Sequence, residues 1–127
     1  MSRRWARAAW LVLDVVAVVV FAAVGRRSHA EGDTVAGVLG TAWPFLVGTA
    51  SGWLVARAWA RPGRVWPSGV VVWLSTVAVG MLLRRLTGDG TAASFVVVAL
   101  VVLGVFLLGW RAARQLVVRR RELVRAP

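Results

Sequence analysis

One acidic residue, Asp14, lies inside an otherwise unbroken apolar stretch from Ala8 to Val24. A carboxylate within the hydrocarbon of a membrane is costly, and such a residue usually has a partner or faces water. Counted from the same end of each apolar stretch, further polar side chains fall at a comparable depth: Thr49, Ser51, Ser75 and Thr76. We therefore predict an intramembrane polar site made of these five residues.

This polar site supports two interpretations. In the first, Asp14 takes up a proton or a cation and exchanges it for a cargo, as a coupled transporter requires. In the second, Asp14 hydrogen-bonds to the neighbouring hydroxyls or pairs with Arg57, and it thereby locks the packing of the helices.

A second group of charged side chains falls at the opposite end of the apolar stretches. Its members are Arg26, Arg27, His29, Glu31, Asp33, Arg84, Arg85 and Asp89. We favour mutual salt bridges, with the arginine stems lying along apolar surface. The alternative is an anion site, because a guanidinium can bind phosphate or carboxylate through two parallel hydrogen bonds. His29 could relay a proton, although a single interfacial histidine more often only forms hydrogen bonds.

The composition excludes several kinds of chemistry. The chain has no cysteine and one histidine, which excludes disulfides, thiolate catalysis and a multi-histidine metal site within one chain. It also lacks a Ser-His-Asp set, a pair of adjacent carboxylates and a metal motif, so an enzyme is the least supported class. We expect neither a metal nor a cofactor.

The elements that must position these residues are membrane-spanning helices. Hydrophobic residues make up 59% of the 127 residues, the mean hydropathy is +0.73, and the apolar residues form long blocks. Since a spanning helix needs about 20 residues, we predict an all-α polytopic membrane protein with four transmembrane helices. The single membrane domain, 1–127, has spans at approximately 8–24, 35–56, 68–83 and 91–110, followed by a basic tail, 111–127.

The second span has the features of a central helix. Pro44 predicts a kink, because proline removes a backbone donor from the helix. Gly48 and Gly52 form a GxxxG pattern, which allows another helix to approach the backbone closely.

A weak internal repeat relates the two halves of the chain. Segments 32–57 and 88–114 can be aligned, with an offset of 57 residues from Thr34 onward, which places Trp53 on Trp110. Both copies run in the same direction, so the protein could consist of two tandem helical hairpins.

The 16 basic residues, all of them arginine, predict the orientation. Twelve lie in the N-terminal segment, the second connection and the tail, against four in the other two connections. The positive-inside rule then places both termini in the cytoplasm, in the inner membrane of a bacterium. Most tryptophans lie near the same interface, where we interpret them as anchors. Because the arginines sit at the ends of apolar blocks, we expect anionic lipid head groups as their partners, not nucleic acid.

Two classes of function fit this architecture. We favour an accessory membrane module that binds lipid or a protein partner. The alternative is a small proton- or cation-coupled transporter that uses Asp14. That alternative implies a homo-oligomer, since four helices enclose little cavity.

Several motifs occur together in this chain. Besides Asp14, they include Gly25-Arg26-Arg27-Ser28-His29-Ala30-Glu31-Gly32, Trp43-Pro44-Phe45, Trp66-Pro67-Ser68-Gly69 and Gly109-Trp110-Arg111. This combination resembles a "domain of unknown function" family of small four-helix membrane proteins frequent in high-GC Gram-positive bacteria. The resemblance covers about residues 14–111 and implies a membrane architecture without an established activity. It marks as positions to test Asp14, Arg26, Arg27, His29, Pro44 and Arg84.

Overall fold

Four helices make up the described part of the chain. The computed structural model describes residues 3–28, 34–88 and 92–125, and the side chains of residues 7–25, 34–88 and 92–125. The helices are α1 (Arg3–Ser28), α2 (Val35–Ala56), α3 (Val70–Leu86) and α4 (Ala93–Arg125), with a short helical turn, η1 (Val65–Gly69), before α3. All four helices, α3 being taken together with η1, are long and apolar enough to cross a membrane, and the described residues contain no strand. The predicted all-α fold with four spans is confirmed.

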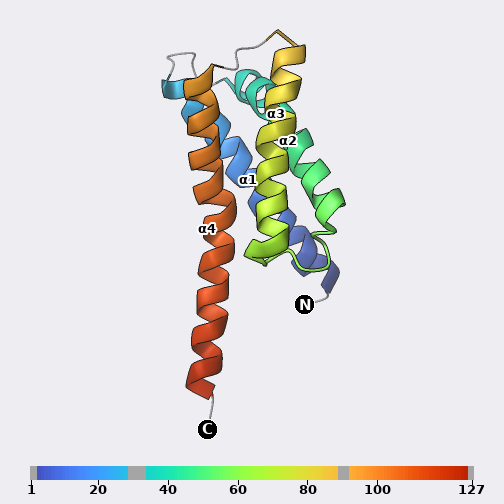
Figure 1. Ribbon diagram of the computed structural model, residues 1–127, viewed down its shortest axis with the longest axis vertical. Helices are drawn as coiled ribbons and strands as arrows, with labels where there is room; N and C mark the ends of the chain where they lie inside the picture. The colour runs from blue at the N-terminus through green and yellow to red at the C-terminus, as the bar shows by residue number, and fades with distance from the viewer. Residues whose placement is uncertain (1–2, 29–33, 89–91, 126–127) are drawn as a thin grey trace.

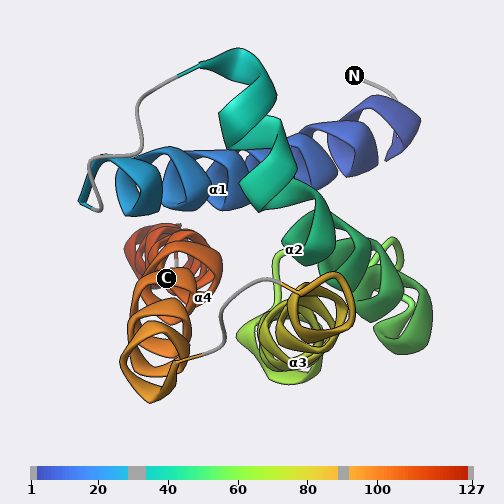
Figure 2. The ribbon, with the colours of Figure 1, turned by 90° about the horizontal axis from the view of Figure 1, so that it is seen from above.

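The helices pack as a bundle in which each one contacts its neighbours in the sequence, and α4 closes back on α1. In Figure 1 the start of α1, the end of α4 and the connection between α2 and α3 lie toward the same end of the bundle. We call this the basic end and define it by Arg7, the connection 57–64 and Arg111. Seen from above, α1 crosses the bundle and lies against both α2 and α4 (Figure 2).

The ends of α2 show how the local sequence sets its length. At the start, the Thr34 hydroxyl accepts a hydrogen bond from the Gly37 backbone N–H at 3.0 Å, which satisfies one of the free donors of the first turn. At the end, Arg57 adopts a left-handed conformation with φ of 49°, and its N–H donates to the Leu54 carbonyl. Pro44 lies buried inside the helix.

Small residues let α2 and α3 approach closely. A Cβ atom on Gly48 would lie 2.7 Å from the Ser75 carbonyl oxygen, and one on Gly52 would lie 2.8 Å from the Val72 Cα. Real Cβ atoms do not approach backbone atoms this closely, so the packing requires glycine at both positions. This close contact joins the second helix of the first predicted hairpin to the first helix of the second.

Three phenylalanines fill the core two turns along α1 from Asp14. Phe21 and Phe45 meet edge to face with their ring centroids 5.3 Å apart, and Phe95 lies 6.2 Å from each of them. Aromatic pairs favour such offset and edge-on geometries. The cluster joins α1, α2 and α4 away from the basic end.

The fourth helix continues beyond the predicted end of its span. The sequence predicts a span at 91–110 followed by a basic tail that is helical at its start, and α4 runs as one helix from Ala93 to Arg125, so the helix continues through the tail to Arg125. About 14 residues, or roughly 21 Å of helix, lie beyond Arg111. We call residues 112–125 the α4 extension. Figure 1 shows it projecting past the other helices.

Candidate functional site

The Asp14 side chain lies inside the bundle and has no exposed surface. One and two turns further along α1, Val18 and Phe21 are also buried, whereas Val12 and Val16 are exposed. Burial therefore follows the helical repeat, and Asp14 occupies the inward-facing stripe of α1.

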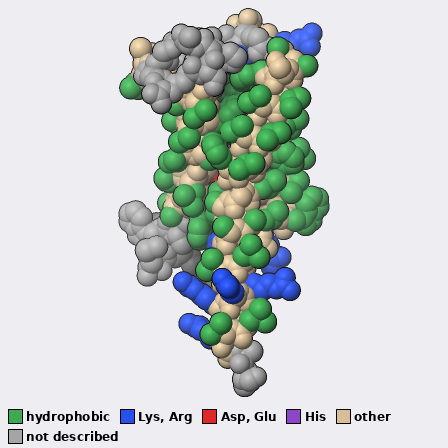
Figure 3. Space-filling model, turned by 90° about the vertical axis from the view of Figure 1, so that its left-hand side faces the viewer, with side chains coloured by type: hydrophobic (Ala, Val, Ile, Leu, Met, Phe, Trp, Pro, Cys, Tyr) green, Lys and Arg blue, Asp and Glu red, His purple; other side chains and the backbone are tan. Residues whose placement is uncertain are grey.

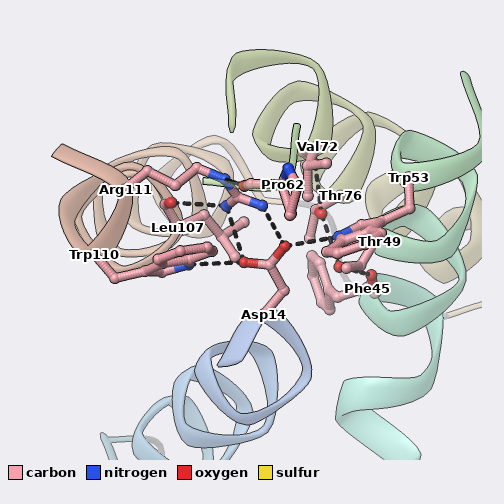
Figure 4. Close-up of polar contacts among 10 residues, drawn as sticks. All are labelled: Asp14, Phe45, Thr49, Trp53, Pro62, Val72, Thr76, Leu107, Trp110 and Arg111. Carbon is pink, nitrogen blue, oxygen red and sulfur yellow. Dashed lines mark hydrogen bonds and ion pairs between the residues drawn. The ribbon is translucent and has the colours of Figure 1, made fainter. Parts of the chain in front are cut away.

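The Asp14 carboxylate accepts four hydrogen bonds from three side chains (Figure 4). The Arg111 guanidinium donates to both oxygens, with distances of 2.9 Å from Nη1 to Oδ1 and 2.6 Å from Nη2 to Oδ2. The Trp53 indole nitrogen donates to Oδ2 at 2.7 Å, and the Trp110 indole nitrogen donates to Oδ1 at 2.9 Å. Each carboxylate oxygen thus accepts one bond from arginine and one from tryptophan.

Arg111 is as deeply buried as its partner. Its Nε donates to the Pro62 carbonyl at 2.8 Å, and its Nη1 also donates to the Leu107 carbonyl at 2.9 Å. A buried charge is tolerated when it is paired and hydrogen-bonded, and both members of this pair meet that condition. The guanidinium joins α4 to α1 and to the connection before η1.

Two tryptophan rings and a second arginine, Arg114, pack next to the ion pair. The Trp10 and Trp110 rings stack with their centroids 5.3 Å apart and their planes 5° from parallel. The Arg111 guanidinium carbon lies 4.3 Å from the Trp110 ring, and that of Arg114 lies 5.2 Å from the Trp10 ring. These distances suit cation–π attraction, so the rings add contacts to both cations.

Of the four hydroxyls that the sequence places beside Asp14, those of Thr49, Ser75 and Thr76 form a separate contact between α2 and α3, and that of Ser51 bonds within α2. Thr49 and Thr76 are buried, and their Oγ1 atoms lie 2.8 Å apart. The hydroxyls of Ser75 and Ser51 donate to backbone carbonyls of α2. The four hydrogen bonds of the Asp14 carboxylate go to arginine and tryptophan, and none goes to these hydroxyls.

The arginine that pairs with Asp14 is Arg111, not Arg57, which the sequence offers as one of two alternatives. Arg57 is exposed and ends α2. Arg111 opens a run of arginines after an apolar span, a pattern typical of head-group anchoring, so the sequence alone assigns it to the tail. Trp53 and Trp110 lie near the predicted interface, where the sequence favours an anchoring role for them. The internal repeat is the sequence signal that could have identified these two tryptophans. It aligns Trp53 with Trp110, and both donate a hydrogen bond to the Asp14 carboxylate.

The predicted outer charged cluster is described only in part. Six of its side chains lie outside the described part of the structure: Arg26, Arg27, His29, Glu31, Asp33 and Asp89. Arg84 lies over the Phe95 ring, 4.7 Å from its centroid, and Arg85 is exposed. An anion site or mutual pairing at this end stays a prediction.

The chemistry of the buried site is that of a saturated ion pair. Among the described side chains no buried nitrogen or oxygen lacks a hydrogen-bond partner. Within the same residues, no three His, Asp or Glu side chains gather where they could hold a metal ion. The Asp14 oxygens already accept N–H groups, so the arrangement is suited to fixing three helices relative to one another.

These features define a class: a multi-pass membrane protein whose helices are tied together by a buried ion pair. Residues 11–114 match the family described as "Protein of unknown function (DUF3054)", and the chain belongs to this family. The matched range contains Asp14 and Arg111. The predicted membership of a family of unknown function is therefore confirmed. No curated protein and no solved structure matches the chain.

Proposed function

We propose that the protein is an accessory module of the bacterial cytoplasmic membrane that binds anionic phospholipid head groups at its basic end. In this proposal both termini lie in the cytoplasm. The observation that carries it is the α4 extension, an exposed basic helix that projects from a bundle fixed by the buried ion pair.

The level of the membrane interface follows from Arg111. Its Nε binds the Pro62 carbonyl, so Arg111 lies level with the connection between α2 and η1. That connection carries exposed arginines whose charged ends must reach head groups or water: Arg57, Arg61 and Arg64. The helix from Ala93 to Arg111 is about 27 Å long, close to the roughly 30 Å of a hydrocarbon core. We therefore place the end of the hydrocarbon near Arg111.

Beyond this level the α4 extension is strongly basic. Its exposed charged residues are Arg114, Arg119, Arg120, Arg121, Glu122 and Arg125. Figure 3 shows basic side chains around this projecting part, below the apolar surface of the bundle. A basic residue near an anionic membrane surface contributes about 1 kcal/mol, and the attraction decays within a Debye length of about 8 Å. The arginines nearest to Arg111 should therefore contribute most.

The geometry of Asp14 does not support the transporter alternative. A coupling carboxylate must release its partner to take up a proton or a cation. Releasing Arg111 would leave a buried unpaired charge, which typically costs about 3–5 kcal/mol. Asp14 fits better as the residue that keeps α4 in place.

A single-cysteine label tests the proposal, because the chain has no cysteine of its own. Val117→Cys, on the α4 extension, would carry an environment-sensitive fluorophore in the full chain reconstituted into vesicles. We expect the emission to shift to the blue when phosphatidylglycerol is added to phosphatidylcholine, and to return when salt is raised, because salt screens the attraction. Identical emission in both lipids would refute head-group binding by this helix.

A further inference from the structure

A groove of about 960 Å³ lies between η1 and the α4 extension at the basic end. One wall is formed by Arg64, Val65 and Trp66, and the other by α4 residues between Ala112 and Glu122. The Val65 N–H donates to Gln115 Oε1 at 2.9 Å, so a hydrogen bond holds the two walls together. The groove is therefore a built feature of the fold.

Three arginines are among the residues that line this groove: Arg64, Arg114 and Arg119. Arg114 lies over the Trp10 ring, and within the described part of the chain its guanidinium makes no hydrogen bond. The side chains of Arg64 and Arg119 have neither a hydrogen bond nor an ion pair with the described residues. Their donors are thus free to bind a ligand, and Glu122 is the acid that also lines the groove.

We propose that this groove binds one anionic phospholipid, whose phosphate is held by Arg64 and Arg119 with support from Arg114. The inference rests on the proposed function, and it adds a defined site and a one-to-one stoichiometry. A guanidinium fork matches the two free oxygens of a phosphodiester, and basic pockets at the cytoplasmic face suit phospholipid head groups.

The position of the groove favours a lipid over a soluble anion. Its α4 wall begins at Ala112, one residue past the level at which we place the end of the hydrocarbon. Trp66, which is 70% exposed, and Leu116, which is 67% exposed, add apolar surface beside the arginines. An indole ring suits the membrane interface, where one side is apolar and the other is wet. Phosphate and apolar contacts at the same level are what a phospholipid offers.

A second copy of the chain is a poorer occupant of the groove. The chain carries a formal net charge of +11, and the α4 extension has five arginines against one acid. Two such extensions placed together would bring like charges into contact, which is unfavourable. Charge complementarity therefore selects an anionic ligand.

Two charge-matched double variants test the site. Arg64→Gln/Arg119→Gln removes two arginines of the groove, and Arg120→Gln/Arg125→Gln removes two arginines of the α4 extension that do not line it. Native mass spectrometry of the full delipidated chain would measure retention of added phosphatidylglycerol against phosphatidylcholine. We expect the wild type and the second variant to retain one phosphatidylglycerol. The first variant should bind it at least about tenfold more weakly, since hydrogen bonds to charged groups contribute more than neutral ones.

The other outcomes would overturn the inference in distinguishable ways. Equally weakened phosphatidylglycerol binding in both variants would indicate attraction by net charge. That result would refute the defined site but would leave the proposed function in place. Displacement of the lipid by inorganic phosphate would indicate a site for a soluble anion. Loss of the bound lipid when two chains associate would indicate that a second copy of the chain occupies the groove. No lipid preference in the wild type, with no emission shift of the Val117→Cys label, would remove both proposals.

Discussion

Asp14 of α1 and Arg111 of α4, 97 residues apart in the chain, form a two-point ion pair with nitrogen–oxygen distances of 2.9 and 2.6 Å. Neither side chain has exposed surface. The net contribution of such a pair to the free energy of unfolding is small, because the cost of removing two charges from water offsets most of their attraction. Loss of one partner is different, since it leaves the other charge buried. We infer that the pair selects how α1 and α4 meet.

We expect Asp14→Asn and Arg111→Gln each to lower the free energy of unfolding by about 3–5 kcal/mol, because each leaves one buried charge without its counter-ion. The double variant should lose less than the sum of the two single losses, since it leaves no unpaired charge. Denaturant unfolding in detergent, followed by tryptophan fluorescence, measures all three values.

Arg57→Gln is the control for these variants, because Arg57 is exposed and does not bind Asp14. Its effect should stay within about 0.5 kcal/mol. If the losses from Asp14→Asn and Arg111→Gln simply add in the double variant, the two residues do not act as a pair.

The indole N–H groups of Trp53 and Trp110 should add to the stability of the protein, in addition to the apolar area that the rings bury. Replacement of either by Phe keeps a ring but removes an N–H that donates to the Asp14 carboxylate. A hydrogen bond to a charged group contributes about 1.5–3 kcal/mol, so we expect losses of that order in the free energy of unfolding. Trp59→Phe is the matched control. Trp59 is partly exposed, so this replacement should lower the free energy of unfolding much less. Equal losses at all three positions would indicate simple anchoring.

The four spans could be predicted from the sequence because long apolar blocks report directly on the membrane. The end of α4 could not be predicted in the same way. Hydropathy falls at Trp110, but no proline or glycine interrupts residues 111–125, and arginine and leucine favour helix. The helix therefore continues where the hydropathy signal stops.

The partner of Asp14 depends on how the helices are rotated about their axes. Neighbouring residues point about 100° apart around a helix, so Arg111 can face the core while Ala112 faces outward. An arginine just past a span is compatible with lipid anchoring or with an inward ion pair, and local sequence does not distinguish them. Asp14 itself could be identified, because a lone acid in an apolar helix needs a partner.

The orientation of the chain can be tested with two further cysteine variants in the cysteine-free background. Ala60→Cys lies in the connection at the basic end, and Thr87→Cys lies past α3 at the other end; both positions are exposed. Because twelve of the 16 arginines lie on the side of Ala60, we expect an impermeant maleimide to label only Thr87→Cys in intact cells. Labelling of Ala60→Cys instead would reverse the proposed orientation.

The contact between α2 and α3 should depend on the missing side chains of Gly48 and Gly52. An Ala methyl at Gly48 would lie 2.7 Å from the Ser75 carbonyl oxygen, and backbone atoms cannot move aside as a flexible side chain can. Overpacking typically costs about 1–3 kcal/mol, and we expect Gly48→Ala and Gly52→Ala to reach the upper part of that range. Gly40→Ala, in the same helix, is the control: apart from the adjacent helix backbone no atom lies within 4 Å of its added Cβ, and alanine favours helix by about 1 kcal/mol over glycine. Thermal unfolding in detergent should therefore show lower midpoints for the first two variants and an equal or higher one for the third. Equal midpoints for Gly40→Ala and Gly48→Ala would mean that α3 can move away from α2 without loss of stability.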